Sequence, residues 1–264
     1  MSQARSQIQQ RAGSALREGY GPAVRRFEIA SIAVFAAAMA WLLLRFLTQV
    51  LEFPFLTASA FMLGFVAADF TSGMVHWLAD TWGSVDLPFV GRALIRPFRE
   101  HHVDPKAITR HDFIETNGNN CFICLAPVTL TAAFVSFDGW QGLFVGVLVF
   151  SLCLWIFCTN QFHKWAHSDD PPAVVAFLQR VSLVLPRDHH SVHHTAPFAT
   201  YYCITVGWLN EPLHRIGFFR GLERVISATT GMLPREDDIG RDAAEAIVEE
   251  EQICPGNATN PEPG

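Results

Sequence analysis

Four long stretches almost free of charged residues constrain this chain more than any other feature. They cover about residues 28–50, 55–79, 121–137 and 140–163. A helix that crosses a bilayer needs about 20 predominantly apolar residues, and spanning structures must satisfy all their backbone polar groups internally. Only 17% of the residues are charged, against about 25% in typical soluble domains. The sequence therefore predicts an all-α integral membrane protein with about four transmembrane helices.

The distribution of basic residues predicts the orientation of these helices. Five arginines precede the first stretch, whereas the links near 51–54 and 137–141 contain neither lysine nor arginine. The segment 80–120 carries Arg92, Arg96, Arg99, Lys106 and Arg110. Cytoplasmic loops are enriched in lysine and arginine, so both termini and the segment 80–120 are expected to face the cytosol. The membrane would be the inner membrane of a bacterium or the endoplasmic reticulum of a eukaryote.

Charge also divides the chain into three parts. Residues 1–27 read as a polar cytosolic tail, and residues 28–235 contain all four apolar stretches. Residues 236–264 hold nine acids and one arginine and are rich in proline and glycine, which is typical of a disordered acidic tail. The basic residues line one side of the membrane and no nucleic-acid-binding motif is present, so binding to DNA or RNA has no support.

The eleven histidines gather on the predicted cytosolic side or at the cytosolic ends of the stretches. His163 and His167 are four residues apart, as are His190 and His194, and residues at i and i+4 share one face of a helix. A single zinc site uses three or four protein ligands, so ten clustered histidines indicate two metal ions. Imidazole suits iron, zinc and copper, and the count alone does not name the metal. His214 stands apart and is expected to be structural.

Several other polar residues lie close to these histidines. An acid inside a span is costly and is functional by default, so Asp69 is predicted to line a substrate channel or support the metal ligands, the alternative being a helix-packing acid. Asp80 is predicted to orient or ligate a metal, and Glu100 and Asn160 to support ligands or contact substrate. Three arginines near the His101/His102 doublet could hold a lipid phosphate, or serve only as topology determinants. They are Arg96, Arg99 and Arg110.

Long runs of residues between about 60 and 235 form recognisable motifs. They include His76-Trp77-x-x-Asp80-Thr81-Trp82-Gly83, Arg96-Pro97-Phe98-Arg99-Glu100-His101-His102, His163-Lys164-Trp165-x-His167, Leu185-Pro186-Arg187-x-His189-His190-x-x-His193-His194 and Tyr202-Cys203-Ile204-Thr205-x-Gly207-Trp208-Leu209-Asn210. These runs resemble the plasmanylethanolamine desaturase family. They are more distantly similar to plant plastid desaturases that act on phosphatidylglycerol.

The resemblance implies a reaction and its cofactors. The family removes two hydrogens from the first two carbons of the 1-O-alkyl chain of plasmanylethanolamine, which makes a plasmalogen. Oxygen is the oxidant, and electrons come from NAD(P)H through a small carrier such as cytochrome b5 or a ferredoxin. The other partners expected are the ether phospholipid substrate and membrane lipids.

The family's histidine motifs, proposed to hold two iron ions, map onto ten catalytic residues of this chain. These are His76, His101, His102, His111, His163, His167, His189, His190, His193 and His194. Eight of the ten are predicted as metal ligands, which leaves out His111 and His189. Carbons one and two of the alkyl chain lie near the head group, at the interfacial depth expected for the histidines.

Two alternatives remain open at this point. The same metal centre could act on an ester-linked chain, as an acyl-lipid desaturase or hydroxylase. From a different class, the chain could be a zinc-binding membrane transporter or scaffold, although transporters usually place their binding sites near the middle of the bilayer.

Overall fold

The computed structural model describes residues 21–234, except 85–86, 89–90, 92–94 and 196–198. Throughout this part of the chain every regular element is a helix. The acidic tail predicted at 236–264 lies outside the described residues, as do residues 1–20 of the predicted N-terminal tail.

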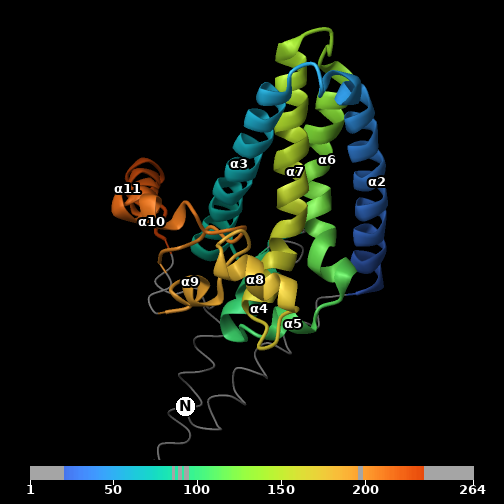
Figure 1. Ribbon diagram of the computed structural model, residues 1–264. Helices are drawn as coiled ribbons and strands as arrows, with labels where there is room; N and C mark the ends of the chain where they lie inside the picture. The colour runs from blue at the N-terminus through green and yellow to red at the C-terminus, as the bar shows by residue number, and fades with distance from the viewer. Residues whose placement is uncertain (1–20, 85–86, 89–90, 92–94, 196–198, 235–264) are drawn as a thin grey trace, which may run out of the picture.

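Four long helices run side by side and form the body of the molecule (Figure 1). They are α2 (Pro22–Phe46), α3 (Pro54–Thr81), α6 (Phe113–Phe134) and α7 (Trp140–Ala166). Helix α3 packs along α7, α2 packs along α6, and α6 also contacts α7. The short 3-10 helix η1 (Leu47–Gln49) follows α2 directly.

The observed helices agree in number with the four predicted stretches but begin at different residues. Helix α2 starts at Pro22, within the predicted polar tail, because proline suits the first position of a helix. Helix α6 starts eight residues before the apolar stretch at 121, because Asp112 caps it by accepting hydrogen bonds from the backbone N–H groups of Ile114 and Glu115. The apolar pattern therefore marks the middle of each helix better than its start.

Three of the four helical segments are long and apolar enough to cross a bilayer. These are Pro22–Gln49, Pro54–Thr81 and Trp140–Ala166. Helix α6 has 22 residues, but its first half carries Glu115, Asn117 and Asn120. The predicted all-α membrane fold is thus confirmed, and the crossing of the bilayer by α6 stays a prediction.

The interior of the bundle is apolar, and so is much of its outer surface. Phe35, Leu42, Val128 and Leu143 belong to one buried cluster that joins α2, α6 and α7. Outward-facing side chains such as Leu51 and Phe55 are almost fully exposed, at 88% and 89%. A surface of this kind suits contact with lipid chains, because a bilayer interior offers no water to which polar groups could bond.

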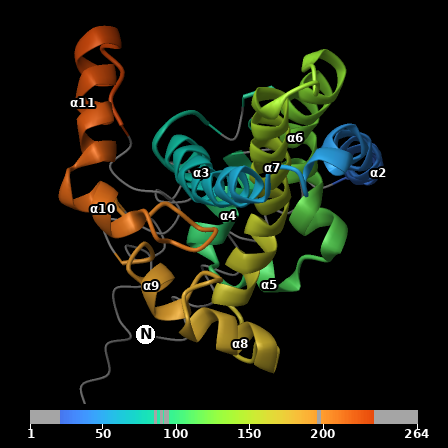
Figure 2. The same cartoon turned by 45° about the horizontal axis from the view of Figure 1, so that its top comes forward.

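The shorter α-helices of the described chain lie toward one end of the bundle, opposite to η1 (Figure 1). Their order in the chain is α4 (Arg96–Val103), α5 (Ala107–Arg110), α8 (Ala173–Arg180), α9 (Arg187–Ser191), α10 (Asn210–Arg215) and α11 (Phe218–Thr230). Figure 2 shows α10 and α11 to one side of the bundle, where Phe219 of α11 packs with Trp77 near the end of α3. This end of the molecule carries the histidine motifs.

Close contact between α3 and α7 depends on a glycine. A Cβ atom at Gly64 would lie 2.7 Å from the backbone oxygen of Leu148 and 2.7 Å from Cβ of Ser151. Ser151 also donates a hydrogen bond of 2.6 Å to the carbonyl of Phe61. The two helices that carry His76 and His163 are therefore held at a short distance.

We expect Gly64→Ala to lower the unfolding free energy by about 1–3 kcal/mol, because the new methyl group overpacks the contact between the helices. Thermal unfolding of the detergent-solubilised protein measures the change. Gly221→Ala is the matched control, since a Cβ atom there meets nothing within 4 Å. A Gly64→Ala protein that melts at the wild-type temperature would contradict this account of the packing.

Candidate metal centre

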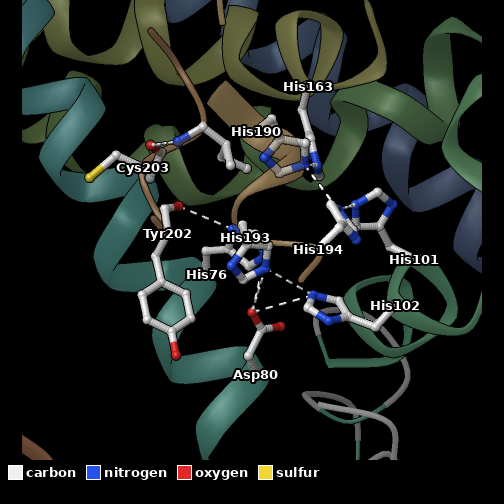
Figure 3. A network of polar contacts seen from close by, with 12 residues as sticks. His76, Asp80, His101, His102, His163, His190, His193, His194, Tyr202 and Cys203 are labelled. Carbon is white, nitrogen blue, oxygen red and sulfur yellow. Dashed lines mark hydrogen bonds and ion pairs between the residues drawn. The ribbon is translucent and has the colours of Figure 1, made fainter. Parts of the chain in front are cut away.

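Four separate segments bring histidines to one buried place at the end of the bundle (Figure 3). His76 lies near the end of α3, His163 in the last turn of α7, and His167 directly after it. Helix α4 contributes the doublet His101/His102. Helix α9 contributes His190, and the turn after it contributes His193 and His194. The structure thus gathers the eight histidines that the sequence analysis predicts as ligands.

The gathered side chains form two neighbouring groups, each able to hold one metal ion. The first group is His101, His163, His167, His190 and His194. The second group is His76, Asp80, His102 and His193. Within each group the ligand atoms lie within 4.8 Å of one another. Asp80 is thus placed among potential ligands, as one of the two roles predicted for it requires.

Residue spacing explains how the histidines divide between the groups. Residues at i and i+4 share a helix face, and the pairs His163/His167 and His76/Asp80 each supply one group. Adjacent helical residues point about 100° apart, which follows from 3.6 residues per turn. The doublet His101/His102 accordingly gives one member to each group, and so does His193/His194 in the turn after α9. These two doublets therefore each supply both groups, whereas only one member of the doublet His189/His190 belongs to a group.

In the first group, ring nitrogens face one another at very short distances. The Nε2 atom of His190 lies 2.8 Å from that of His163 and 3.0 Å from that of His194. His101 Nε2 lies 2.9 Å from His194 Nε2. One proton can satisfy only one such pair, and the buried Nε2 atom of His167 has no hydrogen-bond partner among the described residues. A cation at the shared centre would satisfy these nitrogen atoms together.

The second group is centred on one carboxylate oxygen. Asp80 Oδ2 lies 3.0 Å from Nε2 of His76, 3.4 Å from Nε2 of His102 and 3.5 Å from Nε2 of His193. All four side chains are fully buried. Buried charges need a partner or a metal ion, and a set of imidazole and carboxylate ligands suits a divalent transition metal.

Backbone carbonyl groups fix the orientation of two of these rings. Nδ1 of His76 donates to the carbonyl of Tyr202 at 3.1 Å, and Nδ1 of His193 donates to the carbonyl of Thr200 at 2.9 Å. A carbonyl oxygen only accepts, so Nδ1 of each ring carries a proton. The Nε2 atom of each ring faces the centre of the second group, where it could bind a metal ion, as in known metal sites.

Burial favours the neutral form of several histidines of the two groups that lie outside the long helices. It lowers the pKa values of His101, His190 and His193 well below the usual range, and the neighbouring imidazoles lower them further. Burial is also the main cause that lowers the pKa of His167 to about 3. Only the unprotonated ring binds a metal, so the site is prepared for cations at neutral pH.

Two predicted catalytic histidines lie outside both groups. His111 Nε2 is 3.6 Å from Glu115 Oε1, and the carbonyl of His111 accepts a hydrogen bond from Lys164. His189 Nε2 is 3.1 Å from the amide nitrogen of Asn210. A catalytic role for either residue stays a prediction.

Asp69 holds the loop that orients His76. Its carboxylate is fully buried and accepts three backbone N–H groups, those of Val206 and Gly207 at 2.9 Å and that of Leu209 at 3.1 Å. The side chain of Asn210 fixes the same loop by hydrogen bonds to both backbone groups of Cys203. The hydrogen-bonding role of Asn210 is absent from the sequence analysis, although that residue ends one of the matching motifs.

The remaining predicted site residues lie around the groups. Asn160 of α7 donates to the carbonyl of Thr116 at 2.9 Å and to Oδ1 of Asn120 at 3.2 Å, both in α6. Arg96 is buried, and Arg110 forms an ion pair with Asp104. Arg99 and Glu100 belong to α4, but their side chains lie outside the described part of the structure.

A cavity borders the first group, and we call it the reaction cavity. Its volume is about 50 Å³. His101 and His163 form one wall, and Phe98, Ile108 and Asn160 lie among the other lining residues. Both a polar ligand edge and apolar side chains therefore face the same space.

Comparison with known proteins identifies related sequences. A family described as "Lipid desaturase domain" matches residues 65–237. The chain is 53% identical to the plasmanylethanolamine desaturase of Myxococcus xanthus over 241 residues, which is 91% of this chain and 85% of that protein. It is 55% identical to plasmanylethanolamine desaturase 1 of Mus musculus over 183 residues, 67% of each chain.

A more distant relative is the chloroplastic fatty acid desaturase 4 of Arabidopsis thaliana. It is 37% identical over 176 residues, which is 65% of this chain and 52% of that protein. No solved structure matches the chain.

Neighbouring histidines of α9 allow a test of the two groups. We expect His190→Ala to reduce the amount of bound metal by about half or more. The substitution removes a potential ligand whose Nε2 atom lies close to those of His163 and His194 in the first group. His189→Ala should keep the wild-type metal content, since His189 contacts Asn210 instead. Elemental analysis of the purified proteins measures both. Equal metal contents in the two variants would contradict the assignment.

Asp69 provides a test of the supporting loop. We expect Asp69→Ala to lower the unfolding free energy by about 3 kcal/mol, because three buried N–H groups lose a charged acceptor. Asp69→Asn keeps one acceptor oxygen and should lower the unfolding free energy by a smaller amount. Thermal unfolding with metal bound measures the effect, and an Asp69→Ala protein as stable as the wild type would show that the loop does not depend on this carboxylate.

Proposed function

This chain belongs to the lipid desaturase family, and from that premise we propose that it makes the vinyl ether double bond of plasmalogens. The substrate would be plasmanylethanolamine, a phospholipid with a 1-O-alkyl chain. The proposal is supported by identities of 53% and 55% to two proteins named for this reaction. The observation that carries it is the pair of adjacent ligand groups beside a partly apolar cavity.

Iron is the metal that we propose for both groups. Zinc sites in proteins are mostly four-coordinate, and the first group offers five imidazoles. Ligands would be His101, His163, His167, His190 and His194 for one ion, and His76, Asp80, His102 and His193 for the other. When bound, a di-iron centre supplies the O2-dependent removal of hydrogen from an unactivated alkyl chain, which side chains alone cannot perform.

The proposed reaction balances with an external electron donor. The alkyl chain loses two hydrogen atoms, and O2 is reduced to two molecules of water with two further electrons and two protons. We propose that those electrons come from NAD(P)H through a small carrier such as cytochrome b5 or a ferredoxin.

The protein's own residues bind, orient and exclude water. The carbonyl groups of Tyr202 and Thr200 hold the two rings that they contact. Burial keeps water from the ligands, and Phe98 and Ile108 provide an apolar wall for the chain. Arg96, together with Arg99 and Arg110, is proposed to attract the lipid phosphate.

The depth of the site supports attack next to the head group. At 1.5 Å per residue, His76 lies about 33 Å along α3 from Pro54. The hydrocarbon core of a bilayer is about 30 Å thick. If α3 enters that core at Pro54, His76 lies at the opposite interface. Carbons one and two of a phospholipid chain occupy that depth, whereas the middle of the chain lies deeper.

We propose that the catalytic domain comprises residues 28–235, between the tails 1–27 and 236–264. The membrane would be the inner membrane of a bacterium or the endoplasmic reticulum of a eukaryote. The excess of arginine and lysine near the histidine end supports a site that faces the cytosol.

Expression in a host without plasmalogens tests the reaction. Cells fed with an alkylglycerol should accumulate an acid-labile ethanolamine lipid two hydrogens lighter than its plasmanyl parent, detected by mass spectrometry. His190→Ala should lower the amount of vinyl ether lipid by more than about 100-fold, because loss of a metal ligand disables the centre. His214→Ala is the control, because His214 contacts Thr200 and belongs to neither group.

The alternative outcome is also informative. If the parent lipid and a competent electron donor are present and no vinyl ether forms, the proposed substrate is wrong. A new double bond in ester-linked chains would then assign the chain to acyl-lipid desaturation, in line with the name of the Arabidopsis relative.

A further inference from the structure

Two further cavities adjoin the reaction cavity, and one of them, which we call the polar cavity, has several charged and polar residues in its lining. The polar cavity measures about 60 Å³ and is lined by Glu28, Arg96, His111, Glu115 and three asparagines, among others. An apolar cavity of about 40 Å³ is lined by Val75, Ile123, Ile156 and Ile204, among others. Phe98 and Asn160 line all three cavities. The three cavities are thus neighbours around these two side chains.

We propose that the polar cavity recognises the primary ammonium group of the substrate's head group, with Glu28 and Glu115 as its hydrogen-bond acceptors. The inference rests on the proposed function and adds the residues that select the lipid class. Arg96 in the same lining is suited to the adjoining phosphate, since a guanidinium pairs with phosphate oxygens at two points.

Glu28 is an unusual residue for its position. It lies in the second turn of α2, a candidate membrane span, and is only 1% exposed. A buried acid within a span is costly and marks a functional site by default. Gly118 of α6 lies directly against Glu28, where any Cβ atom would clash with the Glu28 side chain. The contact between α2 and α6 therefore leaves room for this carboxylate and directs it to the cavity that both helices line.

Glu115 approaches the cavity from the first turn of α6. Its side chain is 13% exposed, and Oε1 is 3.6 Å from Nε2 of His111. Two carboxylates thus share a lining with one guanidinium, Arg96. The lining carries both signs of charge, which suits a zwitterion such as phosphoethanolamine better than a ligand of one charge.

The lining also distinguishes a primary from a quaternary ammonium group. A primary ammonium has three N–H donors, and carboxylates and asparagine side chains accept them. A quaternary ammonium has none and is usually bound by a cage of aromatic rings, whereas Phe98 is the one phenyl ring that lines the described cavity. The chemistry therefore favours ethanolamine over choline lipids.

The position of the polar cavity next to the reaction cavity connects binding of the head group with the site of desaturation. The polar and reaction cavities share Pro97, Phe98, His111 and Asn160 in their linings. A head group held by Glu28 and Glu115 would leave the first carbons of the alkyl chain beside His101 and His163. The apolar cavity, which shares Val75, Phe98, Asn120 and Asn160 with the polar one, is suited to the rest of the chain.

The test compares two lipids in proteoliposomes that contain the full-length, metal-loaded protein and an electron donor. Plasmanylethanolamine and plasmanylcholine with the same chains are supplied separately, and kcat/KM for vinyl ether formation is measured for each. For E28Q and E115Q we expect kcat/KM with the ethanolamine lipid to fall about tenfold or more, the range for hydrogen bonds to charged groups. The choline value should change little, so the ratio of the two collapses.

Glu223→Gln is the matched control. Glu223 is also a buried carboxylate, but it accepts a hydrogen bond from Trp77 at 2.8 Å and lines none of the three cavities. Its substitution should leave the lipid ratio unchanged. The variants E28D and E115D keep the negative charge and should retain part of the preference for the ethanolamine lipid. They replace the glutamine variants in the test if a glutamine variant does not fold.

Three results would overturn the inference. One is a fall of equal size for both lipids in E28Q and E115Q, which would indicate a structural role. Another is a wild-type ratio in all four variants. The third is a wild-type protein that uses both lipids equally well. If the wild-type protein forms no vinyl ether from the ethanolamine lipid and none from the choline lipid, the proposed function itself is wrong.

Discussion

The convergence of neutral imidazole lone pairs is the constraint on which the rest of the structure depends. In the first group, Nε2 atoms approach one another to between 2.8 and 3.0 Å, and in the second they surround one oxygen of Asp80. Buried charges and polar atoms need partners, and cations at the centres of the two groups could satisfy these side chains together. The low pKa values of His101 and His190 favour the neutral ring, which leaves one nitrogen atom of each available to a cation.

The surrounding fold maintains this convergence by linking segments far apart in the chain. Gly64 lets α3 and α7 pack closely, which places His76 and His163 together. Asp69 binds the backbone of the loop at Val206–Leu209, and the same loop presents the Tyr202 carbonyl that orients His76. Asn160 joins α7 to α6 and lines the three cavities where we propose that the lipid lies. One polar framework thus serves both the metal ligands and the substrate space.

Local patterns were enough to predict much of this architecture. The apolar stretches predicted the long helices, and the i,i+4 pairs and doublets, with the family resemblance, selected the eight histidines that the structure brings together. The start of α6 was missed because its first turns are polar and their helical state depends on the Asp112 cap. The partners of Asp69 could not be predicted, because Val206 is 137 residues away in sequence. Likewise, Glu28 lies at the edge of a predicted span, and its place in the lining of the polar cavity could not be predicted from the sequence.

Anomalous X-ray scattering at the iron absorption edge, from crystals of protein purified after growth in iron-supplemented medium, tests the central claim most directly. The account predicts two iron peaks per chain. One should lie among His101, His163, His167, His190 and His194, and the other among His76, Asp80, His102 and His193. A single peak, or peaks that appear only at the zinc edge, would contradict a di-iron centre and with it the proposed oxygen-dependent desaturation.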